Sequence, residues 1–321
     1  TLLKLNERYQ RAVLEMGMNR PGEIARLTEI ADPDVGMITN IGMVHLEGLG
    51  DLEGVARAKV ELVEKLSSRG KVILNGDDER LVKKASIFRK EALLFGLGEN
   101  NDVRAHRIKN LGKEGASFDL RYRGASWPVR TRVPGVQNVL NSLAAAAVCF
   151  TLNEPPENII EGLARFEGIK GRFGVTVLPD GVTIVDDTYN ANPLSLKAAF
   201  ESLKALTSRG SRIIVALGEM LELGDATVHA HQEAGQRVAE IGAYHFLAIG
   251  DHAHDMTRGA VKAGMEKKHA EVVRTHTEMV KRIREEMREG DLVFLKASRR
   301  MALEKVAEGL KGHTDILGEM S

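Results

Sequence analysis

A strand, a glycine-rich loop and a helix follow one another within residues 34–61, and this unit constrains the fold more than any other stretch. Residues 34–41 are mostly apolar or β-branched and lie between Pro33 and Gly42, a pattern typical of a buried strand. A helical pattern begins near Leu52. In α/β proteins, phosphates and metals bind where a strand end, a polar glycine-rich loop and a helix N-terminus meet. We therefore treat this unit as a candidate site.

The glycines of the loop differ from the dinucleotide-binding fingerprint. Gly48, Gly50 and Gly54 have the spacing G-x-G-x-x-x-G, whereas the fingerprint requires G-x-G-x-x-G. The loop also carries His45, and a lone histidine in a loop is more often a solvated side chain than a functional one. The glycine spacing alone therefore does not identify a ligand.

Strand patterns alternate with helical patterns along most of the chain, which predicts an α/β fold. Residues 11–17 predict a short strand that contains Glu15, and residues 72–75 and 93–96 predict two more. Between residues 117 and 133, polar and apolar residues alternate with period two. This alternation predicts antiparallel strands at a sheet edge.

A glycine-rich stretch at residues 168–174 marks the expected domain boundary. A chain of 321 residues is long enough for about two domains, and we predict them over residues 1–168 and 169–321. In the second domain, helical segments of about ten to fifteen residues separate the strands, which predicts right-handed crossovers and a doubly wound sheet.

The composition argues against two classes of partner. Lys and Arg together number 45, as do Asp and Glu, so the formal net charge is zero. Because no basic block occurs, we expect no nucleic-acid partner. No apolar run approaches the roughly 18 residues of a bilayer-spanning helix, so we expect no membrane insertion. The single cysteine, Cys149, cannot form an internal disulfide, which fits a reducing cytoplasm.

Three motifs of the chain resemble those of one enzyme family. They are Glu-Met-Gly-Met-Asn-Arg-Pro-Gly-Glu-Ile at residues 15–24, Ile-Thr-Asn-Ile-Gly-Met-Val-His-Leu-Glu-Gly-Leu-Gly at 38–50 with Ala-Arg-Ala-Lys at 56–59, and Asp-Asp-Thr-Tyr-Asn-Ala-Asn-Pro at 186–193. They are similar to motifs of the Mur ligases of peptidoglycan synthesis, and the resemblance extends over nearly the whole chain. It implies an incomplete central ATPase domain with a mixed sheet, followed by a Rossmann-like, doubly wound C-terminal domain.

The resemblance also implies an activity. Within the family, the motifs are most similar to those of the ligase that joins D-alanyl-D-alanine to UDP-N-acetylmuramoyl-tripeptide, through an acyl phosphate formed with ATP. We therefore expect ATP and Mg²⁺ as cofactors, these two substrates as partners, and a monomer acting in the cytoplasm. Two alternatives stay open. One is folylpolyglutamate synthase or another Mur ligase that adds a single amino acid, and the other is a non-catalytic nucleotide-binding module.

Metal ligands are implied by the same resemblance. Glu15, His45 and Lys59 occupy family positions that hold Mg²⁺. A carboxylate oxygen suits Mg²⁺, whereas an imidazole suits it poorly. A bare ammonium cannot bind a cation, so the role of Lys59 requires a pKa low enough for its free amine to react with CO₂. The product, a carbamate on Lys59, would supply two acceptor oxygens.

Two further sets of residues follow from the resemblance. The positions that contact ATP in the family are Asn138, Asn141, Arg172, Asp187, Asn190 and Asn192. The positions implied in catalysis are Lys59, His45, Lys296 and Arg299. The run Lys296-Ala297-Ser298-Arg299 departs slightly from the family's Lys-Gly-Ser-Arg, and Glu219 stands where the family commonly has Asp.

Several of these residues also have a purely structural explanation. Asn138 would cap the helix that it opens, and Arg172 would form an ion pair at the domain boundary. Asp187 would stabilise a turn after a strand. His231, which lies in a helical stretch, would cap that helix or face solvent.

The sequence begins without an initiator methionine, and the motif G-x-x-x-x-G-K-[ST] does not occur in it. Mur ligases depend on that loop to hold the phosphates of ATP. We therefore expect residues 1–321 to be part of a longer enzyme and to be inactive alone.

Overall fold

The computed structural model describes residues 3, 5–43, 45–88, 91–204, 206–207 and 210–312. It divides into two compact units. The first comprises Thr1–Arg107, Phe118–Pro128 and Leu140–Glu161, and the second comprises Ile108–Ser117, Val129–Val139 and Gly162–Ser321. The boundary near residue 168 stays a prediction. Each of the two sheets described below has six strands.

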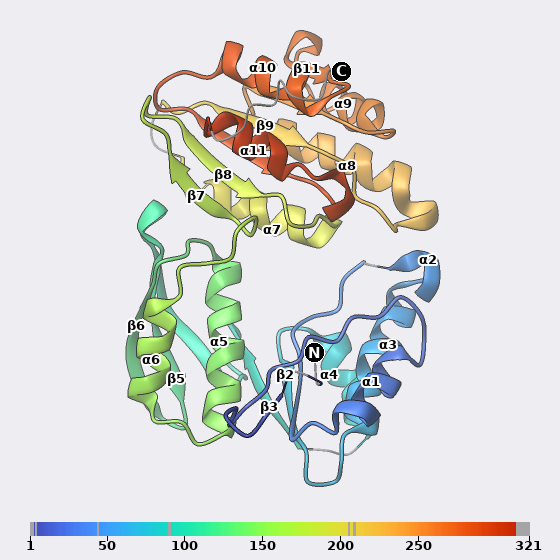
Figure 1. Ribbon diagram of the computed structural model, residues 1–321, viewed down its shortest axis with the longest axis vertical. Coiled ribbons are helices and arrows are strands. Elements are labelled where there is room, and N and C mark those ends of the chain that lie inside the picture. Colours follow the sequence, from blue (N-terminus) through green and yellow to red (C-terminus); the bar gives the residue numbers. More distant parts are fainter. Residues whose placement is uncertain are drawn as a thin grey trace. The chain divides into compact units, whose positions relative to one another are not determined.

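The first sheet has the strand order β1-β2-β3-β4-β5-β6 (Figure 1). Its strands are β1 (Val35–Ile38), β2 (Lys71–Asn75), β3 (Ala92–Gly96), β4 (Val103–Asn110), β5 (Ala116–Tyr122) and β6 (Ala125–Thr131). Strands β1 to β4 pair in parallel. Arg123 and Gly124 join β5 to β6 with φ of 48° and 80°, the left-handed pair that closes a two-residue antiparallel hairpin. The mixed sheet and the antiparallel edge are as predicted.

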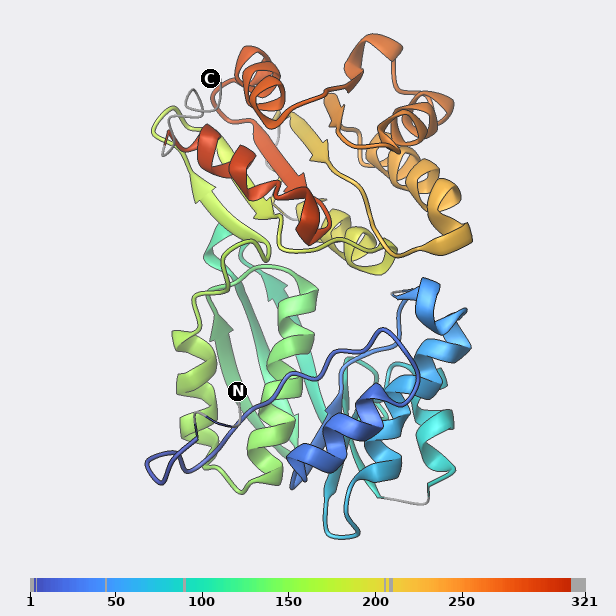
Figure 2. The same ribbon diagram turned by 45° about the vertical axis from the view of Figure 1, so that its right-hand side comes forward.

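Six helices belong to this part of the described chain, and they are α1 (Glu23–Ala31), α2 (Leu46–Leu49), α3 (Leu52–Lys65), α4 (Glu79–Ser86), α5 (Val136–Thr151) and α6 (Pro156–Arg165). Helices α1, α3 and α4 bury apolar side chains with β1 and β2 in one cluster that includes Ile24, Ile38, Val55, Leu74 and Leu81. Helices α5 and α6 lie side by side next to β5 and β6 (Figures 1 and 2). A short 3₁₀ turn, η2 (Gly112–Glu114), joins β4 to β5.

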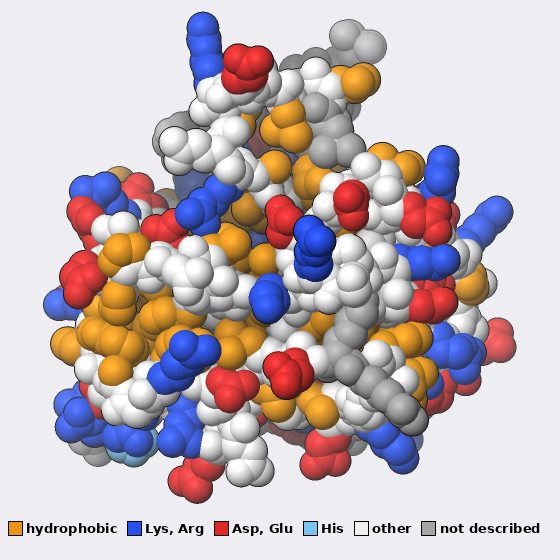
Figure 3. All heavy atoms as spheres, turned by 90° about the horizontal axis from the view of Figure 1, so that it is seen from below, with side chains coloured by type: hydrophobic (Ala, Val, Ile, Leu, Met, Phe, Trp, Pro, Cys, Tyr) orange, Lys and Arg blue, Asp and Glu red, His pale blue; other side chains and the backbone are white. Residues whose placement is uncertain are grey.

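Figure 3 shows one face of the molecule, on which hydrophobic side chains gather at one side while basic and acidic side chains are interspersed over the rest. Among the described residues, no helix is both long enough and apolar enough to cross a membrane.

Two strand predictions in this part differ from the structure, and one strand was not predicted. Residues 11–18 contain no strand. The strand predicted over residues 34–41 ends at Ile38, and β4 was not expected. In the described part of the chain β1 is the edge of its sheet. A strand needs a neighbouring strand to complete its hydrogen bonds, and residues 11–18 do not pair with one.

The second sheet has the order β11-β10-β9-β12-β8-β7. Its strands are β7 (Gly174–Val177), β8 (Thr183–Asp187), β9 (Ile213–Leu217), β10 (His245–Ala248), β11 (Ala270–Val272) and β12 (Leu292–Lys296). All neighbours pair in parallel except β7, which is antiparallel to β8. This is the doubly wound sheet that the alternating pattern predicted.

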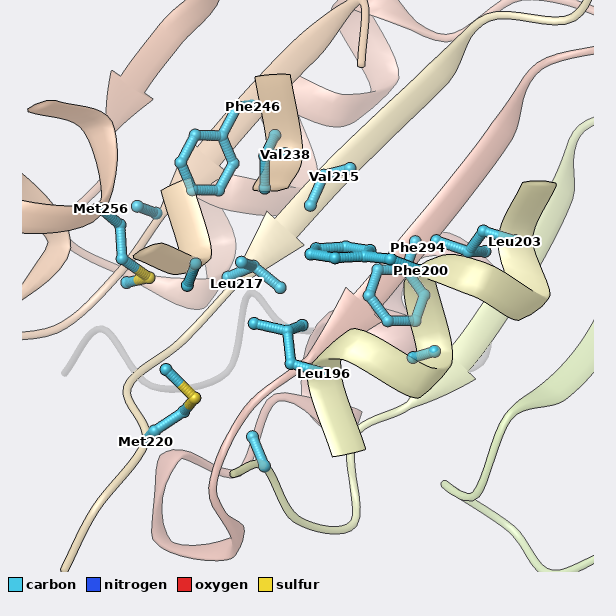
Figure 4. Packing of buried hydrophobic residues seen from close by; sticks show 14 of the residues in the cluster. Leu196, Phe200, Leu203, Val215, Leu217, Met220, Val238, Phe246, Met256 and Phe294 are labelled. Carbon is cyan, nitrogen blue, oxygen red and sulfur yellow. The ribbon is translucent and has the colours of Figure 1, made fainter. Parts of the chain in front are cut away.

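Both faces of this sheet are covered by helices. They are α7 (Pro193–Lys204), α8 (Thr227–Glu240), α9 (Ala253–Lys262), α10 (His276–Glu286) and α11 (Glu304–Leu310), with 3₁₀ turns η3 (Gly224–Ala226), η4 (Lys267–His269) and η5 (Arg299–Met301). Helices α7, α8 and α9 pack on one face through a core that includes Phe200, Val238, Phe246, Met256 and Phe294 (Figure 4). Helices α10 and α11 pack on the other face.

The place of β12 decides where a ligand can bind. This last strand is inserted between β8 and β9. The helix after β12 covers one face, whereas the helices after β8 and β9 cover the other. Ligands of doubly wound sheets bind at the carboxyl ends of strands where the connections diverge in this way. In register, Lys296 at the end of β12 lies opposite Asp187 of β8 and Leu217 of β9.

Candidate functional site

Lys59 lies on α3 and points at the loop that follows β1. Its Nζ donates to the carbonyl oxygen of Asn40 at 2.7 Å. Burial lowers the pKa of Lys59 below its ordinary value, and the carboxylate of Asp78 opposes this effect. The lowered pKa is the condition that the carbamate hypothesis requires, because only the free amine reacts with CO₂.

Asp78 also bonds to the loop that follows β1. Its Oδ2 accepts from the backbone N–H of Ile41 at 2.8 Å, and its Oδ1 caps α4 by accepting from the N–H of Leu81 at 3.0 Å. These contacts explain why β1 ends early, since the N–H of Ile41 bonds to a side chain and not to a neighbouring strand.

The turn before α1 is held by two carboxylates, one on α1 and one on α3. Glu23 Oε2 accepts from the backbone N–H groups of Asn19 at 2.6 Å and Arg20 at 3.1 Å. These bonds lower the pKa of Glu23, with smaller contributions from the charges of Arg20 and His45. Glu61 on α3 accepts from the N–H of Gly22 at 2.7 Å and from the first turn of α1 at 3.0 Å. The turn before α1 is therefore held by one carboxylate of α1 and one of α3.

Close packing explains two glycines of the loop. A Cβ on Gly48 would lie 1.9 Å from the carbonyl oxygen of Asn19, and a Cβ on Gly54 would lie 1.8 Å from that of Leu49. His45 precedes α2 with φ of 55°, a left-handed conformation. The glycine spacing thus serves the packing of α2 between the turn before α1 and the start of α3.

Contacts among the described residues do not join the three predicted magnesium ligands into one site. Glu15 is exposed and lies outside any strand. Among the described residues, no three His, Cys, Asp or Glu side chains form a metal-binding group. Mg²⁺ usually takes one or two carboxylates and completes its shell with water and substrate phosphates. The assignment of Glu15, His45 and Lys59 to a magnesium site therefore stays a prediction.

In the second unit, Lys296 forms a buried ion pair with Asp187. The Nζ of Lys296 lies 2.5 Å from Asp187 Oδ2 and donates to the carbonyl oxygen of Asn190 at 3.0 Å. Asp187 Oδ1 accepts from the N–H of Phe173 at 3.1 Å. Burial raises the pKa of Asp187, and Lys296 partly counteracts this. Three predicted residues, Lys296, Asp187 and Asn190, thus meet at the ends of β8 and β12.

A tyrosine lies beside this ion pair, and sequence reasoning did not single it out. The guanidinium carbon of Arg172 lies 4.1 Å from the centre of the Tyr189 ring, and that of Arg299 lies 5.9 Å from it. Tyr189 also donates its backbone N–H to the carbonyl of Gly171 at 2.9 Å. Arg299 forms an exposed ion pair with Glu304 at 2.7 Å. The sequence signal that could have identified this tyrosine is its place between two predicted site residues in a polar loop.

The asparagines predicted to contact the nucleotide have varied local roles. Asn192 caps α7 by accepting from the N–H of Ser195 at 2.8 Å, and Asn190 Oδ1 accepts from the next N–H at 2.9 Å. Asn138 does not cap α5, because the helix begins at Val136 and the Asn138 amide donates to the carbonyl of residue 134 at 2.7 Å. Asn141 is exposed. Their contacts with a nucleotide stay predictions.

The loop after β9 adjoins the end of β12. Ser298 donates its backbone N–H to the carbonyl of Glu219 at 2.9 Å, and its Oγ accepts from the N–H of Leu221 at 2.9 Å. Glu219 itself is buried, and its Oε1 accepts from the N–H of His252 at 2.8 Å. His231 does not face solvent as expected, because it is fully buried within α8.

The chemistry of this edge suits anionic ligands. Lys296 carries an ammonium, and Arg172 and Arg299 carry permanently charged guanidinium groups that bind phosphate or carboxylate oxygens. Asp187 can accept hydrogen bonds from hydroxyl groups. These groups gather at the strand ends where doubly wound sheets bind their ligands.

Two family models match the chain. The Mur ligase middle domain matches residues 1–149, and the Mur ligase, glutamate ligase domain matches residues 171–299. The curated UDP-N-acetylmuramoyl-tripeptide--D-alanyl-D-alanine ligase of Bacillus subtilis (strain 168) is 33% identical over 310 residues, covering 97% of this chain and 66% of the relative. The ligase of the same name from Escherichia coli (strain K12) is 31% identical over 315 residues, covering 97% and 67%.

A solved structure adds a three-dimensional comparison. The structure of MurF ligase from Thermotoga maritima in complex with ADP is similar to this chain with a TM-score of 0.81 and 27% identity, covering 94% of this chain and 67% of that one. The chain thus spans about two thirds of the length of these proteins.

Proposed function

The chain belongs to the Mur ligase family. We therefore propose that it is part of an ATP-dependent ligase of the cytoplasm that joins D-alanyl-D-alanine to UDP-N-acetylmuramoyl-tripeptide. The observation that carries this proposal is the similarity to ligases of that name along 97% of the chain. The ion pair of Lys296 and Asp187, with Arg172 and Arg299 nearby, supports it because the reaction handles phosphates and carboxylates.

The proposed reaction has two steps. The terminal carboxylate of the tripeptide attacks the γ-phosphorus of ATP, which forms an acyl phosphate and releases ADP. The free amine of D-alanyl-D-alanine then attacks the acyl carbon, loses a proton and expels phosphate, leaving a peptide bond. The protein's contribution is positioning and electrostatic stabilisation of anionic reactants. The basic residues at the end of β12, Lys296 and Arg299, would hold phosphate or carboxylate oxygens.

ATP is the proposed nucleotide, since a similar structure was solved with ADP. Arg172 and Asp187 are proposed to contact its phosphates or ribose, and the asparagines 138, 141, 190 and 192 to line its site. A guanidinium suits phosphate oxygens, and a carboxylate accepts from ribose hydroxyls.

Magnesium is proposed to be held by Glu15, His45 and a carbamate on Lys59, where it would neutralise phosphate charge. The carboxylate of Glu15 and the oxygens of a carbamate suit Mg²⁺, whereas the imidazole of His45 suits it less well. The half-buried Lys59 amine donates to the carbonyl of Asn40 and lies near Asp78, so a carbamate there would add negative charge to an already electronegative environment. A positive ion would relieve that repulsion.

A fusion enzyme tests the proposal. Residues 1–321 are joined behind the portion of the Bacillus subtilis ligase that precedes the matched region. With ATP, UDP-N-acetylmuramoyl-tripeptide and D-alanyl-D-alanine, we expect phosphate release, measured by a phosphate assay. We also expect the corresponding pentapeptide product, detected by mass spectrometry. Lys296→Met should lower the rate. The proposal fails if the folded fusion forms product only with a single amino acid, or only with a folate and glutamate.

The same assay addresses a non-catalytic nucleotide-binding role. If the fusion binds ATP but releases no phosphate with any acceptor, the chain is a binding module and not part of a ligase. Glu15→Ala separates the cases further, because it should weaken Mg²⁺-dependent nucleotide binding only if that carboxylate holds metal.

A further inference from the structure

A fully buried histidine, His231, lies beside the loop that follows β9. Its Nε2 is 3.0 Å from the backbone N of Met220, and its Nδ1 is 2.7 Å from the carbonyl oxygen of Thr227. A backbone N–H can only donate, so Nε2 accepts and carries no proton. The proton is therefore on Nδ1, where it donates to Thr227, and the imidazole is neutral.

The contact with Met220 belongs to a short series of hydrogen bonds that ends at β12. The neighbours of Met220 in the chain, Glu219 and Leu221, both bond to Ser298, through the backbone N–H and the Oγ of that serine at 2.9 Å each. Ser298 lies two residues after the end of β12. His231 thus fixes the middle of a three-residue segment whose two ends hold Ser298.

Other titratable groups surround the imidazole. The ring of His252, which precedes α9, stacks on His231 with 4.9 Å between ring centres and 23° between planes. Asp255 of α9 lies 3.0 Å from His252 Nδ1, and Glu219 of the loop accepts the His252 N–H. Burial is the main cause that lowers the pKa of His231. The hydrogen bond to Thr227 opposes this lowering, as do the charges of Glu219 and Asp255, while the charge of His252 adds to it.

We propose that His231 is a positioning residue that holds residues 219–221 in place only while its imidazole is neutral. Through these residues, His231 also holds Ser298 and the end of β12. Protonation of Nε2 would place one N–H against the N–H of Met220, so the buried amide would lose its acceptor. Acid therefore releases the segment. The importance of His231 for catalysis rests on the proposed function, in which Lys296 contacts substrate. The link between His231 and residues 219–221 does not depend on that function.

Two amide substitutions each keep one half of the imidazole contacts. In His231→Gln, the side-chain Oε1 takes the place of Nε2, so it can accept from Met220 and does not titrate. In His231→Asn, the amide nitrogen takes the place of Nδ1 and the acceptor for Met220 is lost. His229→Asn is the matched control, because His229 is an exposed histidine on the same helix.

Nuclear magnetic resonance of residues 1–321 tests the link without any catalytic activity. In the parent chain and in His229→Asn, we expect ring-nitrogen shifts of the Nδ1–H tautomer for His231. On acidification below about pH 6.5, the amide signals of Met220 and Leu221 should move with the same midpoint as the ring. In His231→Gln these amide signals should stay constant. In His231→Asn the Met220 amide should exchange with solvent about fivefold faster or more.

An Nε2–H tautomer of His231, or amide signals that still titrate in His231→Gln, would overturn the proposal. Activity of the fusion enzyme is a separate readout. If the fusion forms no product, the proposed ligase function fails while the resonance data still decide the role of His231. If it is active, His231→Asn should lower kcat about fivefold or more, His231→Gln should restore it and remove the acid-side inflection, and His229→Asn should match the parent. Equal kcat in all three variants would count against positioning.

Discussion

Replacement of Lys296 by methionine isolates the electrostatic contribution of the buried ion pair in the second sheet. Methionine keeps an unbranched apolar side chain and removes the ammonium. The Lys296 side chain is 3% exposed and that of Asp187 is 15% exposed. Without the ammonium, the Asp187 carboxylate keeps the N–H of Phe173 as a donor, and the carbonyl of Asn190 loses a donor.

Removal of one partner from a buried ion pair costs about 3 to 5 kcal/mol, because the remaining charge stays desolvated. Asp187 retains some exposure, so we expect the lower end, a loss of about 3 kcal/mol in the free energy of unfolding. Adding Asp187→Asn to Lys296→Met removes the stranded charge. The double variant should therefore recover about 2 kcal/mol of that loss.

Native-state hydrogen exchange measured by mass spectrometry, on peptides that cover β8 and β12, reports this loss directly. Lys170→Met is the matched control, since Lys170 Nζ lies 2.7 Å from Glu308 but its side chain is 73% exposed. An exposed pair contributes little, so the control should not change exchange measurably. Equal losses for Lys296→Met and Lys170→Met, or no recovery in the double variant, would refute the reasoning.

Three further predictions concern single positions. Lys59 should carry a carbamate that ¹³C nuclear magnetic resonance detects after exposure to ¹³CO₂. The signal should disappear as the pH falls, because the protonated amine does not react, and absence of the signal at alkaline pH would contradict the prediction. Gly48→Ala places a methyl carbon 1.9 Å from a backbone oxygen and should destabilise the first unit by about 1 to 3 kcal/mol, whereas Gly17→Ala, with open space around it, should have no such effect in thermal unfolding. Gly218→Ala brings a methyl carbon 2.7 Å from the Cβ of Ala297 and should lower the melting temperature. Ala297→Gly in the same chain should restore that temperature. Additive effects of the two changes would count against this contact.

Local sequence patterns were sufficient to predict much of the first sheet. Period-two alternation with a glycine in the middle predicted the hairpin of β5 and β6, because both the strand faces and the turn conformation are local properties. The strand predicted at residues 11–17 is wrong for a non-local reason. Its residues have the right composition, but a strand also needs a neighbour, and composition does not report one. The early end of β1 has a similar cause, since Ile41 bonds to Asp78, 37 residues further along the chain.

The burial of His231 was within reach of the sequence. Ala230, Ala234 and Val238 recur at helical spacing and are buried, so a residue beside the first of them lies near the core face of α8. Helix α8 begins at Thr227, four residues before His231. A cap or a solvent-facing side chain, as expected for His231, suits a residue at a helix end, not one in the second turn on the core face.

The meeting of Lys296 with Asp187 could not be predicted from local patterns, because it depends on strand order. Read along the chain, β8 and β9 are consecutive strands and would be expected to be neighbours. The chain instead continues through β10 and β11 and returns, so that β12 enters between them. This insertion brings the ends of β8, β9 and β12 into register, and it places Lys296 beside Asp187 on one side and Ser298 beside the β9 loop on the other. Residue types at strand ends can therefore be predicted from sequence, but which ends share a site is a property of the sheet that the crossovers build.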